Sequence, residues 1–315
     1  MSSIREPSLS GAADFLNLGC GARFHPDWIN IDIVAQGPGV IEHDLSRGIP
    51  LPDASCDVVY HSAVLEHLRR RDAAAFLGEC HRVLRPGGVL RVAVPDLEAI
   101  CRLYLSKLES ADAGDAAAAH DYEWILLELL DQTVREKSGG DMKDYLGRDP
   151  LDNEAFVFER IGEEGRNLVQ LLREPPVRGE LSFSAVSRKL ARRLRALPGA
   201  ARRCLSQALP GAARRCLSQA LLGDRDRRAL QIGRFRLCGE VHQWMYDRYS
   251  LARLVSEAGF VDPRLQQADT SQIPDWTSYN LDTLPDGRII KPDLFFMEAL
   301  KPGAPIFGQD TRDTR

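Results

Sequence analysis

Two glycines and two aspartates in the first 45 residues have the types and spacing of a ligand site. Gly19 and Gly21 follow the apolar run "FLNL", and glycine adopts backbone angles that other residues avoid. The next segment, "INIDI", alternates apolar and polar residues as strands do, and Asp32 lies near its end. Asp44 follows a further apolar pair in "VIEHDL". Strand, glycine turn and strand with a carboxylate at the tip indicate a site for a nucleoside-containing ligand.

The spacing of these residues argues against a dinucleotide. A dinucleotide-binding turn has a third glycine, and its acidic residue lies about 20 positions further on. Here Phe24 takes the place of the third glycine, and Asp32 follows Gly21 much sooner. The short link also leaves no room for the helix whose first turn would receive a pyrophosphate. S-adenosylmethionine carries adenosine, a carboxylate and an amine but no phosphate, and it fits this pattern better.

Strand-like and helix-like segments alternate around this site, which predicts an α/β fold with a mostly parallel sheet. Strands are expected at 15–18, 29–33, 40–44 and 58–60, and a fifth one runs through Val94. A helix is expected over 73–84, ended by Pro86-Gly87-Gly88. Near the other end, "YSLARLVSEAGF" predicts a helix closed by Gly259, and "LFFMEALKP" predicts a late strand.

A long interruption separates the late strands from the first five. We therefore expect a core of 1–105 and 240–303, a helical insertion of 106–239 on the substrate side, and a flexible tail of 304–315. The insertion contains a perfect tandem repeat, "ALPGAARRCLSQ", at 196–207 and 208–219, which indicates a local duplication. Arginines and apolar residues in this part stand at helical spacing, and two Pro-Gly pairs divide it into short helices.

Several motifs occur here in the order of a known family: "LNLGCG", "HDL", "CDVVYHSAVLEHL", "RVLRPGGVLRVAVPD", "SLARLVSEAGF" and "FFMEALKP". In these motifs the chain resembles class I S-adenosylmethionine-dependent methyltransferases of the small-molecule type, over roughly 14–104 and 240–302. The resemblance implies a Rossmann-like seven-stranded sheet, interrupted between strands five and six by the helical insertion. It also implies that the protein is an enzyme whose cofactor is S-adenosylmethionine.

The resemblance assigns nine residues to the cofactor: Gly19, Cys20, Gly21, Asp32, Ile33, Asp44, Leu45, Ser62 and Ala63. Within this set, Asp32 would accept both ribose hydroxyls, and Asp44 with the backbone of Leu45 would face adenine. Ser62 and Ala63 would line the methionine end. The short links after strands one and two depart from the family, which often has full helices there. The alternative interpretation of the glycines is an ordinary tight turn, with Cys20 filling space.

Methyl transfer to a hydroxyl benefits from a general base, and His242 is our first candidate, with Asp96 as a second. His242 lies in the polar and aromatic segment "GEVHQWMYDRYS", where Glu240 could orient it. Glu66 and His67 in "LEHL" fit a packing role as well as a catalytic one. Five residues are expected to contact the substrate: Glu240, Tyr246, Trp276, Tyr279 and Asn280. A packing role for these aromatic side chains has equal weight.

These residues predict O-methylation of a sugar, a glycan or a polar secondary metabolite. The alternatives are N-methylation of a small amine and a non-catalytic binding module that keeps the cofactor fold. A net charge of −4 over 315 residues gives no reason to expect nucleic acid as a partner.

The bulk composition predicts a soluble, cytoplasmic protein. None of the seven cysteines forms a CxxC pair, so we expect a reducing compartment and no metal. The chain has neither an apolar leader nor an apolar run long enough to span a membrane. The basic stretch 186–223 fits either a solvated loop or reversible binding to an anionic membrane surface that carries a lipid-linked glycan.

Overall fold

The computed structural model describes residues 14–173 and 223–307. The tandem repeat at 196–219 and, apart from Gly223, the basic stretch 186–223 lie outside the described residues, as does the tail from 308. The chain divides into two compact units. The first consists of 1–135, 139–173 and 241–315, and the second of 136–138 and 174–240.

The described part of the second unit contains helix α9 (Asp224–Arg236). Its Arg228 pairs with Glu136 at 3.4 Å.

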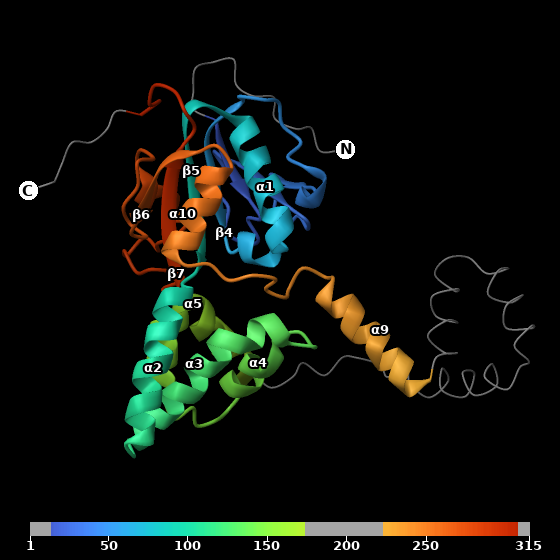
Figure 1. Ribbon diagram of the computed structural model, residues 1–315, viewed down its shortest axis with the longest axis vertical. Helices are drawn as coiled ribbons and strands as arrows, with labels where there is room; N and C mark the ends of the chain where they lie inside the picture. The colour runs from blue at the N-terminus through green and yellow to red at the C-terminus, as the bar shows by residue number, and fades with distance from the viewer. Residues whose placement is uncertain (1–13, 174–222, 308–315) are drawn as a thin grey trace, which may run out of the picture. The chain divides into compact units, whose positions relative to one another are not determined.

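Within the described residues, seven strands form one sheet in the order β3-β2-β1-β4-β5-β7-β6 (Figure 1). The strands are β1 (Phe15–Leu18), β2 (Ile29–Asp32), β3 (Val40–Glu42), β4 (Cys56–Ser62), β5 (Leu84–Pro95), β6 (Val261–Gln266) and β7 (Leu294–Leu300). Neighbouring strands from β3 to β5 run parallel, and β7 runs antiparallel to both β5 and β6. The predicted mostly parallel seven-stranded sheet is confirmed.

Two helices cover one face of the sheet, α1 (Arg70–Val83) and α10 (Arg248–Glu257) (Figure 1). Their apolar side chains form a core cluster with Leu16, Leu18 and Val59 of the strands. Helix α1 starts three residues earlier than the pattern predicts. Strand β5 begins at Leu84, directly after α1, and the Pro-Gly-Gly stretch lies inside the strand.

Aromatic side chains cover the opposite face of the central strands. Because side chains alternate along a strand, Phe15 and Tyr60 point away from Leu16 and Val59. They pack with Trp28 and with Trp276 of the short helix η3 (Trp276–Tyr279). Residues 19–28, between β1 and β2, contain no helix. The short link predicted after the first strand is therefore present.

Four more helices lie beyond the carboxyl end of β5: α2 (Leu97–Asp112), α3 (Ala116–Val134), α4 (Gly140–Leu146) and α5 (Glu154–Arg173) (Figure 1). They pack around the fully buried Trp124. They belong to the same unit as the sheet, whereas the sequence places a boundary at 105. The physical reason is that α2 starts directly from β5, with Asp96 as its N-terminal cap.

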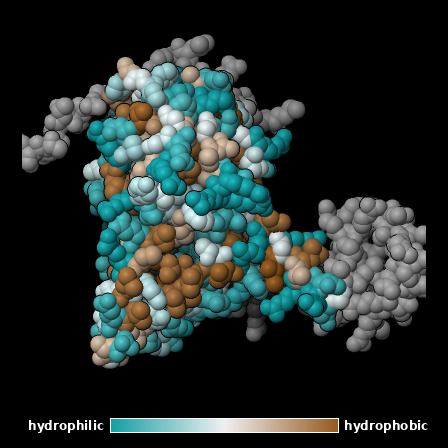
Figure 2. All heavy atoms as spheres, viewed as in Figure 1, coloured by the Kyte–Doolittle hydropathy of each residue, from teal (hydrophilic) through white to brown (hydrophobic). Residues whose placement is uncertain are grey.

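The surface over these helices is notably apolar (Figure 2). Leu105 of α2 and Leu130 and Val134 of α3 are among the exposed apolar residues of these helices. None of the helices in the described residues is both long enough and apolar enough to span a bilayer.

A buried arginine connects the sheet to the long segment that precedes β7. Arg91 of β5 is fully buried and donates hydrogen bonds to Asp282 (3.0 Å) and Glu298 (2.8 Å). It also donates to the carbonyl oxygens of Thr270 and Gln267, at 2.8 and 2.9 Å. This network satisfies a charge that would be costly to bury alone.

Arg91→Met is expected to destabilise the fold by roughly 3–5 kcal/mol, because it leaves two buried carboxylates without their cation. The measurement is the free energy of unfolding in urea. Arg288→Met is the matched control, since Arg288 forms its ion pairs with Asp286 and Glu163 at the surface. That control should change the free energy of unfolding far less, because ion pairs at the surface are screened by water. Equal losses in the two variants would contradict the importance of the network.

A buried histidine predicts sensitivity to acid. His61 of β4 is fully buried against Phe76, and burial lowers its pKa to about 3. The imidazole is therefore neutral in the folded chain but binds a proton in the unfolded chain below about pH 6.5. Its contribution to stability is complete above pH 6.5 and falls as the pH drops from 6.5 towards 3, by about 2 kcal/mol between pH 7 and 5. His61→Leu should reduce the pH dependence of the unfolding free energy by about that amount. An unchanged pH dependence would refute the assignment of this acid sensitivity to His61.

Candidate functional site

The glycine turn after β1 has a conformation that other residues do not adopt readily. Gly19 and Gly21 have positive φ angles of 62° and 51°. The Gly19 amide donates to the carbonyl of Ile31 at 2.8 Å, which holds the turn against β2. A Cβ atom at Gly19 would lie 2.4 Å from Val64, whereas a Cβ at Gly21 would meet nothing within 4 Å. Gly19 is therefore required for both its conformation and its lack of a side chain.

Asp32, at the end of β2, is held in place by backbone amides. Its carboxylate accepts hydrogen bonds from Gly21 at 2.8 Å and from Val34 at 3.1 Å. Each oxygen keeps a lone pair for a further donor. The neighbouring Ile33 is 63% exposed, so an apolar side chain lies open beside the carboxylate. This combination suits a ribose with an attached base.

Two buried asparagines hold the link between β1 and β2 in the absence of a helix. The Asn17 amide donates to the carbonyl of Arg23 at 3.0 Å and to the side chain of Asn30 at 3.2 Å. Asn30 in turn donates to the carbonyls of His25 and Trp28. The asparagines thus satisfy backbone carbonyls that a helix would otherwise satisfy internally.

A cavity of about 310 Å³ opens beside the glycine turn. Five residues of the predicted cofactor set line it: Gly19, Cys20, Gly21, Ser62 and Ala63. Burial and the charge of Asp32 raise the pKa of the Cys20 thiol to about 11, so it is uncharged at neutral pH. Tyr60 and Asp282 also line the cavity, and the tyrosine hydroxyl donates to the carboxylate at 2.6 Å.

Sequence reasoning missed the charged residues of this cavity. Lys291, before β7, and Glu164, on α5, both line it and lie 3.6 Å apart. Neither belongs to a motif, and only the folded chain brings them to the glycine turn. Arg23, which also lines the cavity, carries no signal beyond its place in the turn.

Asp44 and Leu45 lie outside the lining of this cavity. Asp44 caps the short helix η1 (Leu45–Arg47) and accepts a hydrogen bond from Ser46 at 3.0 Å. Hydrogen bonds from the side chain of Ser46, and then from its backbone amide, lower the pKa of the Asp44 carboxyl. Their predicted contact with adenine stays a prediction.

The first candidate base, His242, precedes Tyr246 by four residues, and the second, Asp96, forms a backbone bridge with Tyr246. Asp96 also caps α2 by accepting a hydrogen bond from Ala99 at 2.9 Å. His242 is almost completely buried. Burial, followed by the positive neighbours His67, Arg135 and Lys291, lowers the pKa of His242 to about 3. Its neutral imidazole is present at neutral pH but is a weak base.

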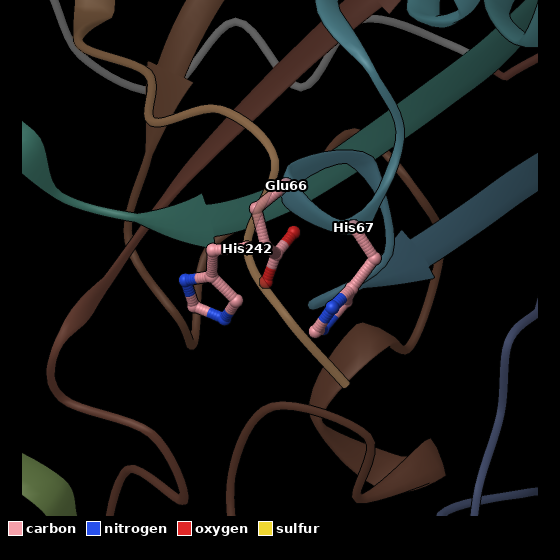
Figure 3. A group of neighbouring side chains, drawn as sticks. All are labelled: Glu66, His67 and His242. Atoms are coloured by element: carbon pink, nitrogen blue, oxygen red, sulfur yellow. The ribbon is translucent and has the colours of Figure 1, made fainter. Parts of the chain in front are cut away.

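His242 meets two residues that the sequence analysis considered for packing or catalysis. Its ring centroid lies 4.8 Å from that of His67, and Glu66 completes the group (Figure 3). Glu66 and His67 form the end of the short helix η2 (Leu65–His67), which follows β4.

The residues expected to contact substrate occupy different environments. Tyr246 is buried in the core beneath α10, and Trp276 is buried with its ring 4.4 Å from the Arg91 guanidinium. Tyr279 is half-buried against Phe15 and Trp28, and Asn280 donates to the carbonyl of Ser278. Glu240 belongs to the second unit. The structure shows packing roles for Tyr246 and Trp276, and a substrate contact by any of the five residues stays a prediction.

Comparison with known proteins identifies the segment that carries the glycine turn. Residues 16–92 match a family described as "Methyltransferase domain". A probable S-adenosylmethionine-dependent methyltransferase of Mycolicibacterium smegmatis is 41% identical over 100 residues, which cover 26% of this chain and 38% of that protein. A probable S-adenosylmethionine-dependent methyltransferase of Mycobacterium tuberculosis is 37% identical over 102 residues, 27% of this chain and 36% of that protein.

Solved structures give similar matches. The S-adenosylmethionine-dependent methyltransferase of Mesorhizobium loti is 23% identical, with a TM-score of 0.22, over 27% of this chain and 48% of that one. The 1,6-didemethyltoxoflavin-N1-methyltransferase of Burkholderia thailandensis, solved with S-adenosylhomocysteine, is 18% identical, with a TM-score of 0.24, over 27% and 46%.

Residues 16–92 therefore match a methyltransferase domain, and the curated relatives that share this segment are probable S-adenosylmethionine-dependent methyltransferases. The family predicted from the motifs and its cofactor are both confirmed. The chain spans less than two fifths of the length of these curated relatives.

Gly19→Ala and Gly21→Ala form a matched pair. Comparing them separates the cost of a steric clash with Val64 from the cost of the left-handed backbone conformation. Alanine at either position adopts a left-handed conformation, at a cost of roughly 1–2 kcal/mol. Only the variant at Gly19 also forces its new methyl group into Val64. We expect Gly19→Ala to lower the free energy of unfolding clearly more than Gly21→Ala. Equal effects in a urea titration would show that Val64 moves aside without cost.

Proposed function

We propose that this chain transfers a methyl group from S-adenosylmethionine to an oxygen atom of a polar acceptor, such as a sugar, a glycan or a polar secondary metabolite. The observation that carries the proposal is the cavity at the glycine turn beside Asp32. A carboxylate, an exposed isoleucine and a cavity in succession match the ribose, the adenine and the methionine part of the cofactor.

The charges of the cavity suit the methionine part. This part of the cofactor carries a carboxylate and an ammonium group. Lys291 offers an ammonium and Glu164 a carboxylate on the cavity wall, and the two are 3.6 Å apart. We propose that they exchange this mutual ion pair for contacts with the zwitterion of the cofactor. Ser62, the last residue of β4, and Ala63 line the same cavity, which supports their proposed place beside the methionine end.

The acceptor would approach from the side of His242 and Asp96, beneath α2 to α5. The buried imidazole of His242 supports a hydroxylated acceptor, because it can replace a hydrogen bond that the acceptor makes to water. N-methylation of a small amine is a second candidate. The low pKa of His242 favours it, because a neutral amine attacks without a strong base.

Asp32→Asn tests the cofactor site with little change in shape. The amide keeps an oxygen for the Gly21 amide but removes the charge that would receive two ribose hydroxyls. A charged hydrogen bond contributes about 1.5–3 kcal/mol, so the affinity for S-adenosylmethionine should fall at least about tenfold in calorimetry. Asp53→Asn is the control, since Asp53 is exposed and pairs with Arg82 away from the cavity. Undiminished affinity in Asp32→Asn would refute the ribose assignment.

Mass spectrometry of reactions with the cofactor and a panel of acceptors tests the transfer itself. We expect a product with one added methyl group from hydroxylated acceptors such as sugars and glycans. Methylation of amines alone would establish the second candidate. Failure of the wild-type chain to bind the cofactor would leave the non-catalytic binding module as the better interpretation.

A further inference from the structure

Three potential ligand atoms converge outside the residues that line the cavity. Glu66 and His67 come from η2, and His242 comes from the loop before α10. One ligand atom of each lies within 4.8 Å of the other two. Figure 3 shows the carboxylate of Glu66 between the two imidazole rings.

Backbone hydrogen bonds hold these segments together. The carbonyl of Glu66 accepts hydrogen bonds from the amides of Gln243 at 2.6 Å and Trp244 at 3.2 Å. The amide of His242 donates to the carbonyl of Gln132 on α3 at 2.9 Å. These backbone contacts fix the relative positions of the three residues, and the side chains only need to adjust.

Glu66 is buried in a manner that calls for a cation. It is completely inaccessible to solvent, and neither carboxylate oxygen has a hydrogen-bond partner among the described residues. The Nδ1 atom of His242 also lacks a partner in the described structure. Buried polar groups of folded proteins are normally paired, so each of these atoms needs an explanation.

We propose that Glu66, His67 and His242 form a binding site for a divalent transition-metal ion, with Zn²⁺ as the best match. Two imidazoles and one carboxylate favour zinc and its neighbours over Mg²⁺ and Ca²⁺, which prefer oxygen ligands only. The donor set has no thiolate, which explains why the cysteine pattern gave no sign of a metal.

The spacing requires a modest contraction on binding. Bonds of about 2.1 Å in a tetrahedral site place ligand atoms about 3.4 Å apart. The present separations reach 4.8 Å. Rotation about the side-chain bonds of His67 and His242 can close this gap while the backbone contacts stay in place. Three protein ligands leave a fourth position for water or another small ligand, as in open zinc sites.

Metal binding can be measured without the cofactor or an acceptor, so its outcome is independent of the proposed methyl transfer. The full chain without a histidine tag is stripped with a chelator and titrated with Zn²⁺ by calorimetry, and bound metal is counted by native mass spectrometry. We expect one ion per chain at micromolar zinc. Co²⁺ should give the visible absorption of a site with nitrogen and oxygen ligands, without a thiolate charge-transfer band.

Glu66→Gln and His242→Ala should each weaken zinc binding by at least about tenfold, because the first removes the negative charge of a ligand and the second removes an imidazole ligand. His120→Ala is the matched control, since His120 also lies near a carboxylate, that of Asp152 at 3.9 Å, but at the surface. It should bind zinc as the wild type does. Circular dichroism and cofactor affinity report whether each variant is folded.

If a ligand variant does not fold, the zinc site can still be tested directly on the wild-type chain. X-ray absorption at the zinc edge should then show two imidazoles and oxygen. Three outcomes overturn the site. They are a wild type that does not bind zinc stoichiometrically, ligand variants that bind zinc as tightly as the wild type, and sulfur among the atoms that coordinate the zinc.

Discussion

The charge of Arg91 at the centre of the sheet constrains much of the structure. A guanidinium in a fully buried strand must find acceptors for its donors, and the sheet itself supplies only Glu298 of β7. The remaining acceptors come from Asp282 and from carbonyls of 267–270, which therefore have to fold back over the sheet. Asp282 in turn accepts from Tyr60, in the wall of the cavity. The same network thus fixes both the long segment before β7 and part of the candidate cofactor site.

The folded-back segment also explains how the sheet tolerates such short connections. A parallel sheet is normally covered by helices on both faces. Here α1 and α10 cover one face, and the aromatic cluster around Trp276 covers the central strands on the other. The cation of Arg91 lies against the Trp276 ring, so the charge network and the aromatic cluster stabilise one another. The link from β1 to β2 can then serve the ligand site, because it does not have to cover the sheet.

A single stretch that begins with the last residue of β4 connects the two candidate sites. Ser62 and Ala63 line the cavity, Val64 limits the space at Gly19, and Glu66 and His67 face His242. Ala63 has a positive φ of 53°, which turns the chain sharply at the end of the strand. If a ligand at one site moved this stretch, the displacement would extend to the other site, because only a few residues separate them. The same short segment therefore contributes to the proposed metal site and to the proposed cofactor site, although different residues form the two sites.

The sequence by itself determined the sheet, the glycine turn and the carboxylate at the end of β2. These features depend on local rules: side chains alternate along strands, and glycine alone adopts the angles at position 19 without strain. Local rules could not place Lys291 and Glu164 at the cavity, or His242 beside Glu66, because those contacts join residues far apart in the chain. They also could not show that Trp276 is buried, since an aromatic residue in a polar loop fits a substrate wall as well as a packed core. Only the tertiary structure decided these points, because burial and long-range contact depend on where the whole chain folds back on itself.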